Sequence, residues 1–159
     1  MENMKSFQEL VNNCLKTVRE VFPWDLEENV DKNASPVLLD IREPYEFEIL
    51  HIKGSLNVPR GILELACDYG YDDTIPELVT ARDKEVIVIC RSGHRSVLAA
   101  HTMQIMGYKS VKSLKTGVKG WNDYELPLQN VKGQHIDSDM ADDMLTPRVK
   151  PEQKYPDRL

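Results

Sequence analysis

One short stretch constrains this chain more than any other: VIVICRSGHRSVLAA, residues 86–100. Val86 to Cys90 form a continuous run of β-branched and small apolar residues, which is typical of a strand buried on both faces of a parallel sheet. After the loop, apolar residues recur at helical spacing, so we expect a helix over 95–106. The pattern places Cys90 at a turn from a buried strand into a helix, where two arginines and a histidine crowd around Gly93.

Further strands are expected on both sides of this stretch. Short β-rich runs occur at PVLLDI (36–41), SLNV (55–58), EVIVIC (85–90) and SVKSL (110–114), and helical segments separate most of them. Strands that alternate with helices indicate an α/β domain with a mainly parallel central sheet flanked by helices.

Composition narrows the class of protein. The chain has 159 residues, of which 41% are hydrophobic and 29% charged, as in ordinary globular domains. A formal charge of −6 argues against nucleic acid or an anionic membrane as the main partner. The three cysteines match no zinc spacing and no disulfide framework, and no basic stretch precedes an apolar segment. We therefore expect a cytoplasmic protein that binds neither a membrane nor nucleic acid.

The chain divides into three parts. Residues 1–34 are expected to form an N-terminal amphipathic helix and a linker, because a capping box at Ser6 precedes an apolar stripe that runs from Phe7 to Phe22. Residues 35–128 form the α/β domain. Residues 129–159 are a charged, proline-containing tail, expected to be mostly solvated. Met140 and Met144 are four apart and offer the alternative of a short docking helix.

Chemistry-bearing residues follow each predicted strand. Since ligands bind at the carboxyl ends of the strands in open parallel sheets, these residues are expected at one edge. They are Asp40 and Arg42 after the first strand, Arg60 and Gly61 after the second, Cys90 with its loop after the third, and Lys115, Thr116 and Gly117 after the fourth.

The loop after Cys90 has the features that a nucleophilic thiol needs. A cysteine thiol is mostly protonated at neutral pH, and helix amides and cations favour its anion. Positive φ at Gly93 would let the loop curl. The loop also carries two cations, two hydroxyl donors and a titratable ring: Arg91, Arg95, Ser92, Ser96 and His94. The pattern predicts a reactive cysteine with an anion-binding loop.

Residues 35–128 resemble the rhodanese family of single-domain sulfurtransferases. The resemblance rests on LLDIREPYEFEILHIKGSLNVPRG (38–61), VIVICRSGHRS (86–96) and the stretch from LAAHTMQIMGYKSVKSL through GWNDYELPL (98–128). It implies a parallel sheet flanked by helices and sulfur transfer from a small anionic donor such as thiosulfate. The implied acceptor is cyanide, a thiol or a sulfur-carrier protein, and no metal or organic cofactor is implied.

The same resemblance implies roles for individual residues. Cys90 would carry the sulfur as a persulfide, while Arg91 and Arg95 attract the donor and offset charge on the leaving group. Asp40 and Arg42 match the family's DxRE stretch and would support the loops around the site. Apart from the resemblance, the position of Arg60 at a strand end makes it either a second anion contact or a solvated loop arginine. Trp121 matches the family pattern as a packing residue, whereas Thr116 and Glu125 stand where the family usually has glycine.

Two alternatives stay open. Cysteine-dependent phosphatases and arsenate reductases resemble Cys-x5-Arg, and the loop from Cys90 to Arg95 is one residue shorter. A non-catalytic rhodanese-like binding module is the other alternative, although such modules often lack the cysteine. Cys67 is expected as a semi-buried helix residue, with a resolving thiol as its alternative, and Cys14 as a small core residue.

Overall fold

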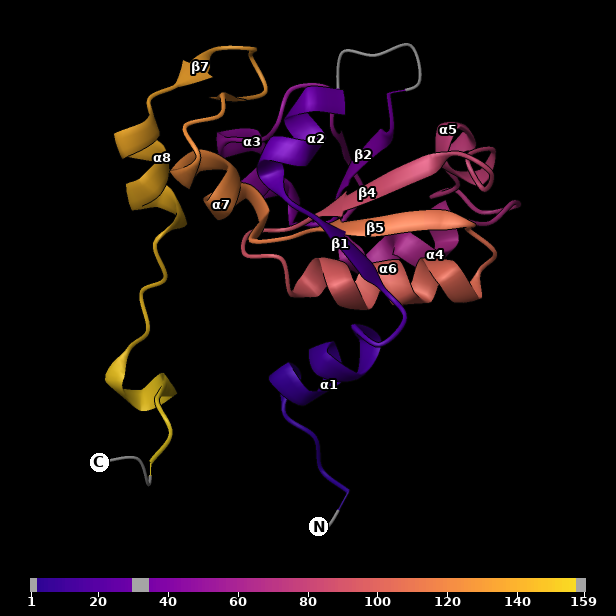
Figure 1. Ribbon diagram of the computed structural model, residues 1–159, viewed down its shortest axis with the longest axis horizontal. Helices are drawn as coiled ribbons and strands as arrows, with labels where there is room; N and C mark the ends of the chain where they lie inside the picture. The colour runs from indigo at the N-terminus through magenta and orange to yellow at the C-terminus, as the bar shows by residue number, and fades with distance from the viewer. Residues whose placement is uncertain (1–2, 30–34, 157–159) are drawn as a thin grey trace.

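The computed structural model describes residues 3–29 and 35–156 and forms a five-stranded parallel sheet with helices on both faces (Figure 1). The strands are β1 (Arg19–Val21), β2 (Val37–Asp40), β3 (Leu56–Asn57), β4 (Glu85–Ile89) and β5 (Ser110–Leu114). They lie in the order β1-β5-β4-β2-β3, so β4 is the central strand. The predicted α/β fold with a mainly parallel sheet is confirmed.

Helices cover both faces of the sheet. One face carries α1 (Phe7–Cys14), α4 (Leu63–Ala66), α5 (Pro76–Val79) and α6 (Arg95–Ile105), and the other carries α2 (Pro23–Asn29), α3 (Pro44–Ile49), α7 (Gly117–Asp123) and α8 (Ser138–Leu145) (Figure 1). Single 3₁₀ turns lie at Arg60–Ile62 and Pro151–Gln153, and β6 (Leu128–Gln129) pairs antiparallel with β7 (His135–Ile136). Within the described parts of the chain, no helix is long and apolar enough to cross a membrane.

The continuous apolar run at residues 86–90 belongs to the central strand, β4, and its end. Val86, Val88 and Cys90 point into the core cluster under α6, and Ile87 and Ile89 point into the cluster under α7. Successive side chains of a strand alternate between the faces of its sheet, and both faces of this sheet are covered. All five side chains are therefore buried.

The N-terminal segment differs from the single long helix expected up to Phe22, and that prediction is wrong. Helix α1 ends at Cys14, and residues 19–21 form β1, which pairs parallel with β5. The segment gains ladder hydrogen bonds at the sheet edge, including that from Lys115 N to Val21 O at 2.9 Å. Pro23 starts α2 rather than ending a helix, as proline does at a first helical position. Residues 30–34 of the expected linker lie outside the described residues.

The stretch after residue 128 is more ordered than a solvated tail. Helix α8 begins after Asp137, whose carboxylate accepts hydrogen bonds from Asp139 N and Met140 N. It packs on α7 through Ala141 and Leu145, which are buried. A short docking helix therefore forms, as the alternative to a solvated tail expected, but Met140 and Met144 are 55% and 46% exposed, so its packing face lies one position further along the helix. A small alanine lets the two helices approach closely, which a search for large apolar side chains overlooks.

Two residues adopt the backbone conformation that glycine favours. Thr116 has φ 66° and Glu125 has φ 58°, both in the left-handed region. At both positions the backbone therefore has the conformation that a glycine would adopt without strain. Trp121 is buried beside them and donates a hydrogen bond from Nε1 to Pro127 O at 2.9 Å, as expected for a packing residue.

Candidate active site

Cys90 lies between the end of β4 and the start of α6, where its sulfur is surrounded by backbone donors. Gly93 N and Ser96 N donate hydrogen bonds to Sγ over 3.1 and 3.3 Å. Ser96 N belongs to the first turn of α6, where helix N–H groups have no partner within the helix. Both donors, together with the positive end of the helix, stabilise negative charge on the sulfur.

A buried chain of hydroxyl groups continues from the thiol. Cys90 Sγ donates to Ser96 Oγ at 3.3 Å, and Ser96 Oγ lies 2.7 Å from Ser113 Oγ on β5. Both serines are buried. Ser96 was predicted from the loop pattern, but Ser113 was missed; the available signal was a serine at an inward-facing position of a strand.

Two glycines shape the loop. Gly93 has φ 88°, and a Cβ on it would lie 2.8 Å from Thr116 N and 3.0 Å from Leu114 O. Gly117 has φ 62°, and a Cβ there would overlap the carbonyl groups of Cys90 and Arg91. The start of α7 therefore packs directly against the loop, as the predicted strand-end placement of Gly117 requires.

A pocket of about 390 Å³ opens over Cys90. Its lining residues are Phe7, Cys90, Arg91, Ser92, His94 and Arg95. Four of the loop residues predicted beside Cys90 thus line the pocket with it. Phe7 comes from α1 and was not predicted as a site residue.

The two loop arginines differ in what they contact. Arg95 donates two hydrogen bonds to the Glu46 carboxylate, from Nη1 to Oε1 at 3.2 Å and from Nη2 to Oε2 at 3.0 Å. Burial alone would lower the pKa of Arg95, but the hydrogen bonds and charge of Glu46 outweigh it and raise the pKa. The Arg91 side chain forms no hydrogen bond or ion pair with any residue in the described ranges. Arg91 is therefore the cation free to meet an anion in the pocket.

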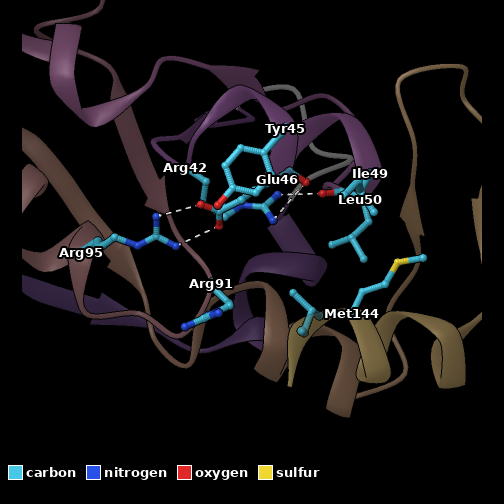
Figure 2. Close-up of a pocket in the computed structure, with 9 residues that line it drawn as sticks. Arg42, Tyr45, Glu46, Ile49, Leu50, Arg91, Arg95 and Met144 are labelled. Atoms are coloured by element: carbon cyan, nitrogen blue, oxygen red, sulfur yellow. Dashed lines mark hydrogen bonds and ion pairs between the residues drawn. The ribbon is translucent and has the colours of Figure 1, made fainter. Parts of the chain in front are cut away.

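A second pocket of about 360 Å³ lies on the other side of the loop, between α3 and α8 (Figure 2). Its lining residues are Arg42, Tyr45, Glu46, Ile49, Leu50, Arg91, Arg95, Met144 and Leu145. Arg91 and Arg95 line both pockets. The two pockets are therefore neighbours that share the cationic part of the loop.

Comparison with known protein families identifies the family of this domain. The family model described as "Rhodanese-like domain" matches residues 23–124, which include the whole Cys90 loop. The chain belongs to the rhodanese-like domain family.

Three similar proteins illustrate the family. The chain is 35% identical over 105 residues to "Putative sulfur carrier protein YrkF" of Bacillus subtilis, covering 66% of this chain and 51% of that protein. It is 32% identical over 103 residues to "Putative thiosulfate sulfurtransferase, mitochondrial" of Schizosaccharomyces pombe, covering 63% of this chain and 72% of that protein. A solved Rhodopseudomonas palustris structure, described as "Protein of Unknown Function" and "Possible Tyrosine Phosphatase", is 30% identical with a TM-score of 0.73 and covers 79% of this chain and 96% of that one. The chain spans about half the length of the Bacillus protein.

Asp40 and Arg42 form a buried ion pair in this rhodanese-like domain. Arg42 Nη2 lies 2.7 Å from Asp40 Oδ2, Arg42 Nε donates to both carboxylate oxygens, and Nη2 also donates to Leu50 O at 2.7 Å. Both side chains are at most 2% exposed. The pair joins the end of β2 to the end of α3, which is the kind of supporting contact expected of it.

Arg60 is not brought to the pocket over Cys90. Its guanidinium donates to Glu64 Oε1 at 2.7 Å and to Thr102 Oγ1 at 3.2 Å, on the surface between the 3₁₀ turn and α6. Neither contact reaches the Cys90 loop. The sequence placed Arg60 at the correct sheet edge but could not show which way its side chain turns.

The two other cysteines also lie elsewhere. Cys67, expected as a semi-buried helix residue, is completely buried at the end of α4 in the core cluster under α6, and this burial raises the pKa of its thiol. Cys14 packs against the same cluster. Neither Cys67 nor Cys14 lines the pocket over Cys90. In the described ranges, no cluster of three histidine, cysteine or acidic side chains could hold a metal ion.

Proposed function

We propose that this protein is a sulfurtransferase that carries sulfane sulfur on Cys90. The observation that carries the proposal is the pair of backbone donors, Gly93 N and Ser96 N, at 3.1 and 3.3 Å from Cys90 Sγ. Such donors stabilise a sulfur anion before the reaction and the terminal sulfur of a persulfide after it. The names of the Bacillus and Schizosaccharomyces relatives support sulfur transfer as the reaction class.

The reaction has two displacement steps. The Cys90 thiolate attacks the outer sulfur of thiosulfate, a new S–S bond forms, and sulfite leaves with the electron pair of the old bond. A nucleophilic acceptor then attacks the outer sulfur of the Cys90 persulfide, and the Cys90 thiolate leaves. Each step exchanges one sulfur bond for another, so the protein needs no external oxidant or reductant.

The loop arginines take different parts in this reaction. Arg91, which has no partner in the described ranges, attracts the anionic donor and offsets charge on the departing sulfite. Arg95 acts as a positioning residue, because its bidentate contact with Glu46 holds the start of α6 and with it Ser96 N. Ser96 and Ser113 hold the orientation of the thiol through their hydroxyl chain.

We assign the acceptor to the class of thiophilic nucleophiles: cyanide, a low-molecular-weight thiol, or a sulfur-carrier protein. The sulfur carrier named in the Bacillus relative supports the last of these. The charge of −6 does not favour nucleic acid or an anionic membrane as a partner, and we propose that the protein works in the cytoplasm.

Intact-protein mass spectrometry tests the proposal directly. Incubation of the full chain with thiosulfate should add one sulfur, about 32 Da, and cyanide should remove it. Cys90→Ser should abolish the adduct, whereas the matched variants Cys14→Ser and Cys67→Ala should keep it. An adduct that persists in the Cys90 variant would overturn the mechanism.

The open alternatives give different results in the same preparation. A phosphatase would hydrolyse an aryl phosphate in a Cys90-dependent manner and would gain no sulfur. A non-catalytic module would show no adduct with thiosulfate or with a small persulfide, although iodoacetamide still alkylates Cys90. Either pattern would refute the proposed sulfurtransferase.

A further inference from the structure

Helix α1 contributes to the pocket over Cys90 although it lies outside the family match. The match covers residues 23–124, while α1 spans Phe7–Cys14. Phe7 lines the pocket together with Cys90 and the loop residues around it. The aromatic wall of the pocket therefore comes from a segment outside the matched residues.

The position of Phe7 is set by the way α1 is held. Val11 on α1 is buried in the core cluster under α6, and Gln104 Nε2 on α6 donates to Thr17 O at 3.0 Å just after α1. At its other end, Ser6 N donates to Glu9 Oε2 at 2.7 Å and Glu9 N donates to Ser6 Oγ at 3.1 Å. This capping box starts the helix at Phe7, so the ring is presented from a fixed helical position.

The ring itself is placed for contact with a ligand. It forms a T-shaped pair with the His94 ring, with centroids 6.3 Å apart and an interplanar angle of 85°. The Phe7 side chain is nevertheless 50% exposed, so much of its apolar surface still faces water. Every other lining residue except Cys90 presents a cation or a polar group. The pocket thus combines one large apolar surface with the free cation of Arg91.

We propose that Phe7 is a specificity-determining residue that selects sulfur donors carrying an apolar group next to an anionic one. The proposal rests on the sulfurtransferase function and names the substrate class of the same site. In an organic thiosulfonate, R–SO₂–S⁻, the apolar R group would pack on Phe7 and the sulfonyl oxygens would face Arg91. The Cys90 thiolate attacks the terminal sulfur, the S–S bond to the sulfonyl group breaks, and the sulfinate R–SO₂⁻ leaves with its electrons.

Steady-state kinetics with two donors test this inference. The ratio of kcat/KM for benzenethiosulfonate to that for thiosulfate should fall about fivefold in Phe7→Ala, because the aromatic contact is lost. Phe7→Leu, which keeps an apolar wall, should lose less. Leu10→Ala is the matched control, since Leu10 lies on the same helix, is 44% exposed and does not line the pocket, and its ratio should stay unchanged. An unchanged or increased ratio in Phe7→Ala would overturn the inference.

A second readout separates this inference from the proposed function. Cys90 is alkylated with N-phenylmaleimide or with N-methylmaleimide, and the rate of each alkylation is followed by the mass of the Cys90 peptide. Each rate is divided by the rate at which the same reagent alkylates free cysteine. The wild type should prefer the phenyl reagent, Phe7→Ala should lose the preference, and Leu10→Ala should keep it. If these alkylation preferences are found but the protein transfers no sulfur, the proposed function is refuted while the selectivity of Phe7 for aromatic groups is supported. If the protein transfers sulfur but Phe7→Ala changes neither the preference for benzenethiosulfonate nor that for N-phenylmaleimide, the inference about Phe7 is refuted and the proposed function stands.

Discussion

The guanidinium of Arg95 pairs with the Glu46 carboxylate through two hydrogen bonds, at 3.2 and 3.0 Å. Arg95 is the first residue of α6 and Glu46 lies on α3, so the pair ties the helix that supports the Cys90 loop to the opposite face of the sheet (Figure 2). Its charge is therefore used for positioning, and that of Arg91 is left for the pocket.

We expect Glu46→Gln to destabilise the protein by about 1 kcal/mol at neutral pH, because the pair is only partly buried. Burial tends to raise the pKa of Glu46, but the hydrogen bonds and charge of Arg95 and the charge of Arg42 lower it below its usual value. The contribution is therefore complete above the ordinary glutamate pKa and is lost as pH falls through the lower folded-state pKa. Urea unfolding of wild type and variant at several pH values measures the difference.

The exposed Glu48 on the same helix offers the control. Glu48→Gln should change stability by less than about 0.5 kcal/mol at any of these pH values. If the stability difference between wild type and Glu46→Gln stayed constant into strong acid, the pair would not be the source of that stability.

The buried pair between Asp40 and Arg42 should be far more sensitive. Asp40→Asn leaves the Arg42 guanidinium buried without a counter-charge, which typically costs about 3 kcal/mol or more. Adding Arg42→Met to this variant removes the uncompensated charge, so the double variant should recover part of the loss. Urea unfolding of the three proteins checks this, and a double variant less stable than Asp40→Asn would contradict it.

Much of the sheet was predictable because its signals are local. The run from Val86 to Cys90 needs only its own composition to be recognised as a doubly buried strand, and the glycine and arginines after it follow at once. β1 was missed because three residues, 19–21, give too short a pattern to separate from the end of a helix. Only pairing with β5, which is distant in sequence, makes it a strand.

The same distinction applies to the site. Cys90, Arg91, Ser92, His94 and Arg95 are neighbours in sequence, and the structure places them around one pocket as expected. Glu46 and Phe7 come from distant segments, and no pattern near them indicates that they meet the loop. Arg60 shows the converse, since a residue at the correct edge can still turn its side chain toward Glu64 and Thr102.

Gly93→Ala tests the backbone cradle. Alanine at φ 88° is strained, and its Cβ would lie 2.8 Å from Thr116 N, so the loop must shift. Because Gly93 N donates to Cys90 Sγ, the shift should lower kcat for sulfur transfer at least about tenfold, the equivalent of losing one charge-assisted hydrogen bond. Gly61→Ala is the matched control, since a Cβ there would meet no atom within 4 Å. Equal kcat values in the two variants would show that the cradle is not needed.

Arg91 is expected to act mainly on donor binding. Arg91→Gln removes the free cation of the pocket, so KM for thiosulfate should rise about fivefold to tenfold. Added salt should raise KM in the wild type and have less effect in the variant, because the charge that salt screens is absent from the variant.

Two further variants serve as controls. Arg91→Lys should retain part of the affinity for thiosulfate. Arg95→Gln should instead lower both stability and kcat, because the contact with Glu46 is lost. Steady-state kinetics at two ionic strengths measure these effects, and an unchanged KM with equal salt dependence in Arg91→Gln would assign donor attraction to another group.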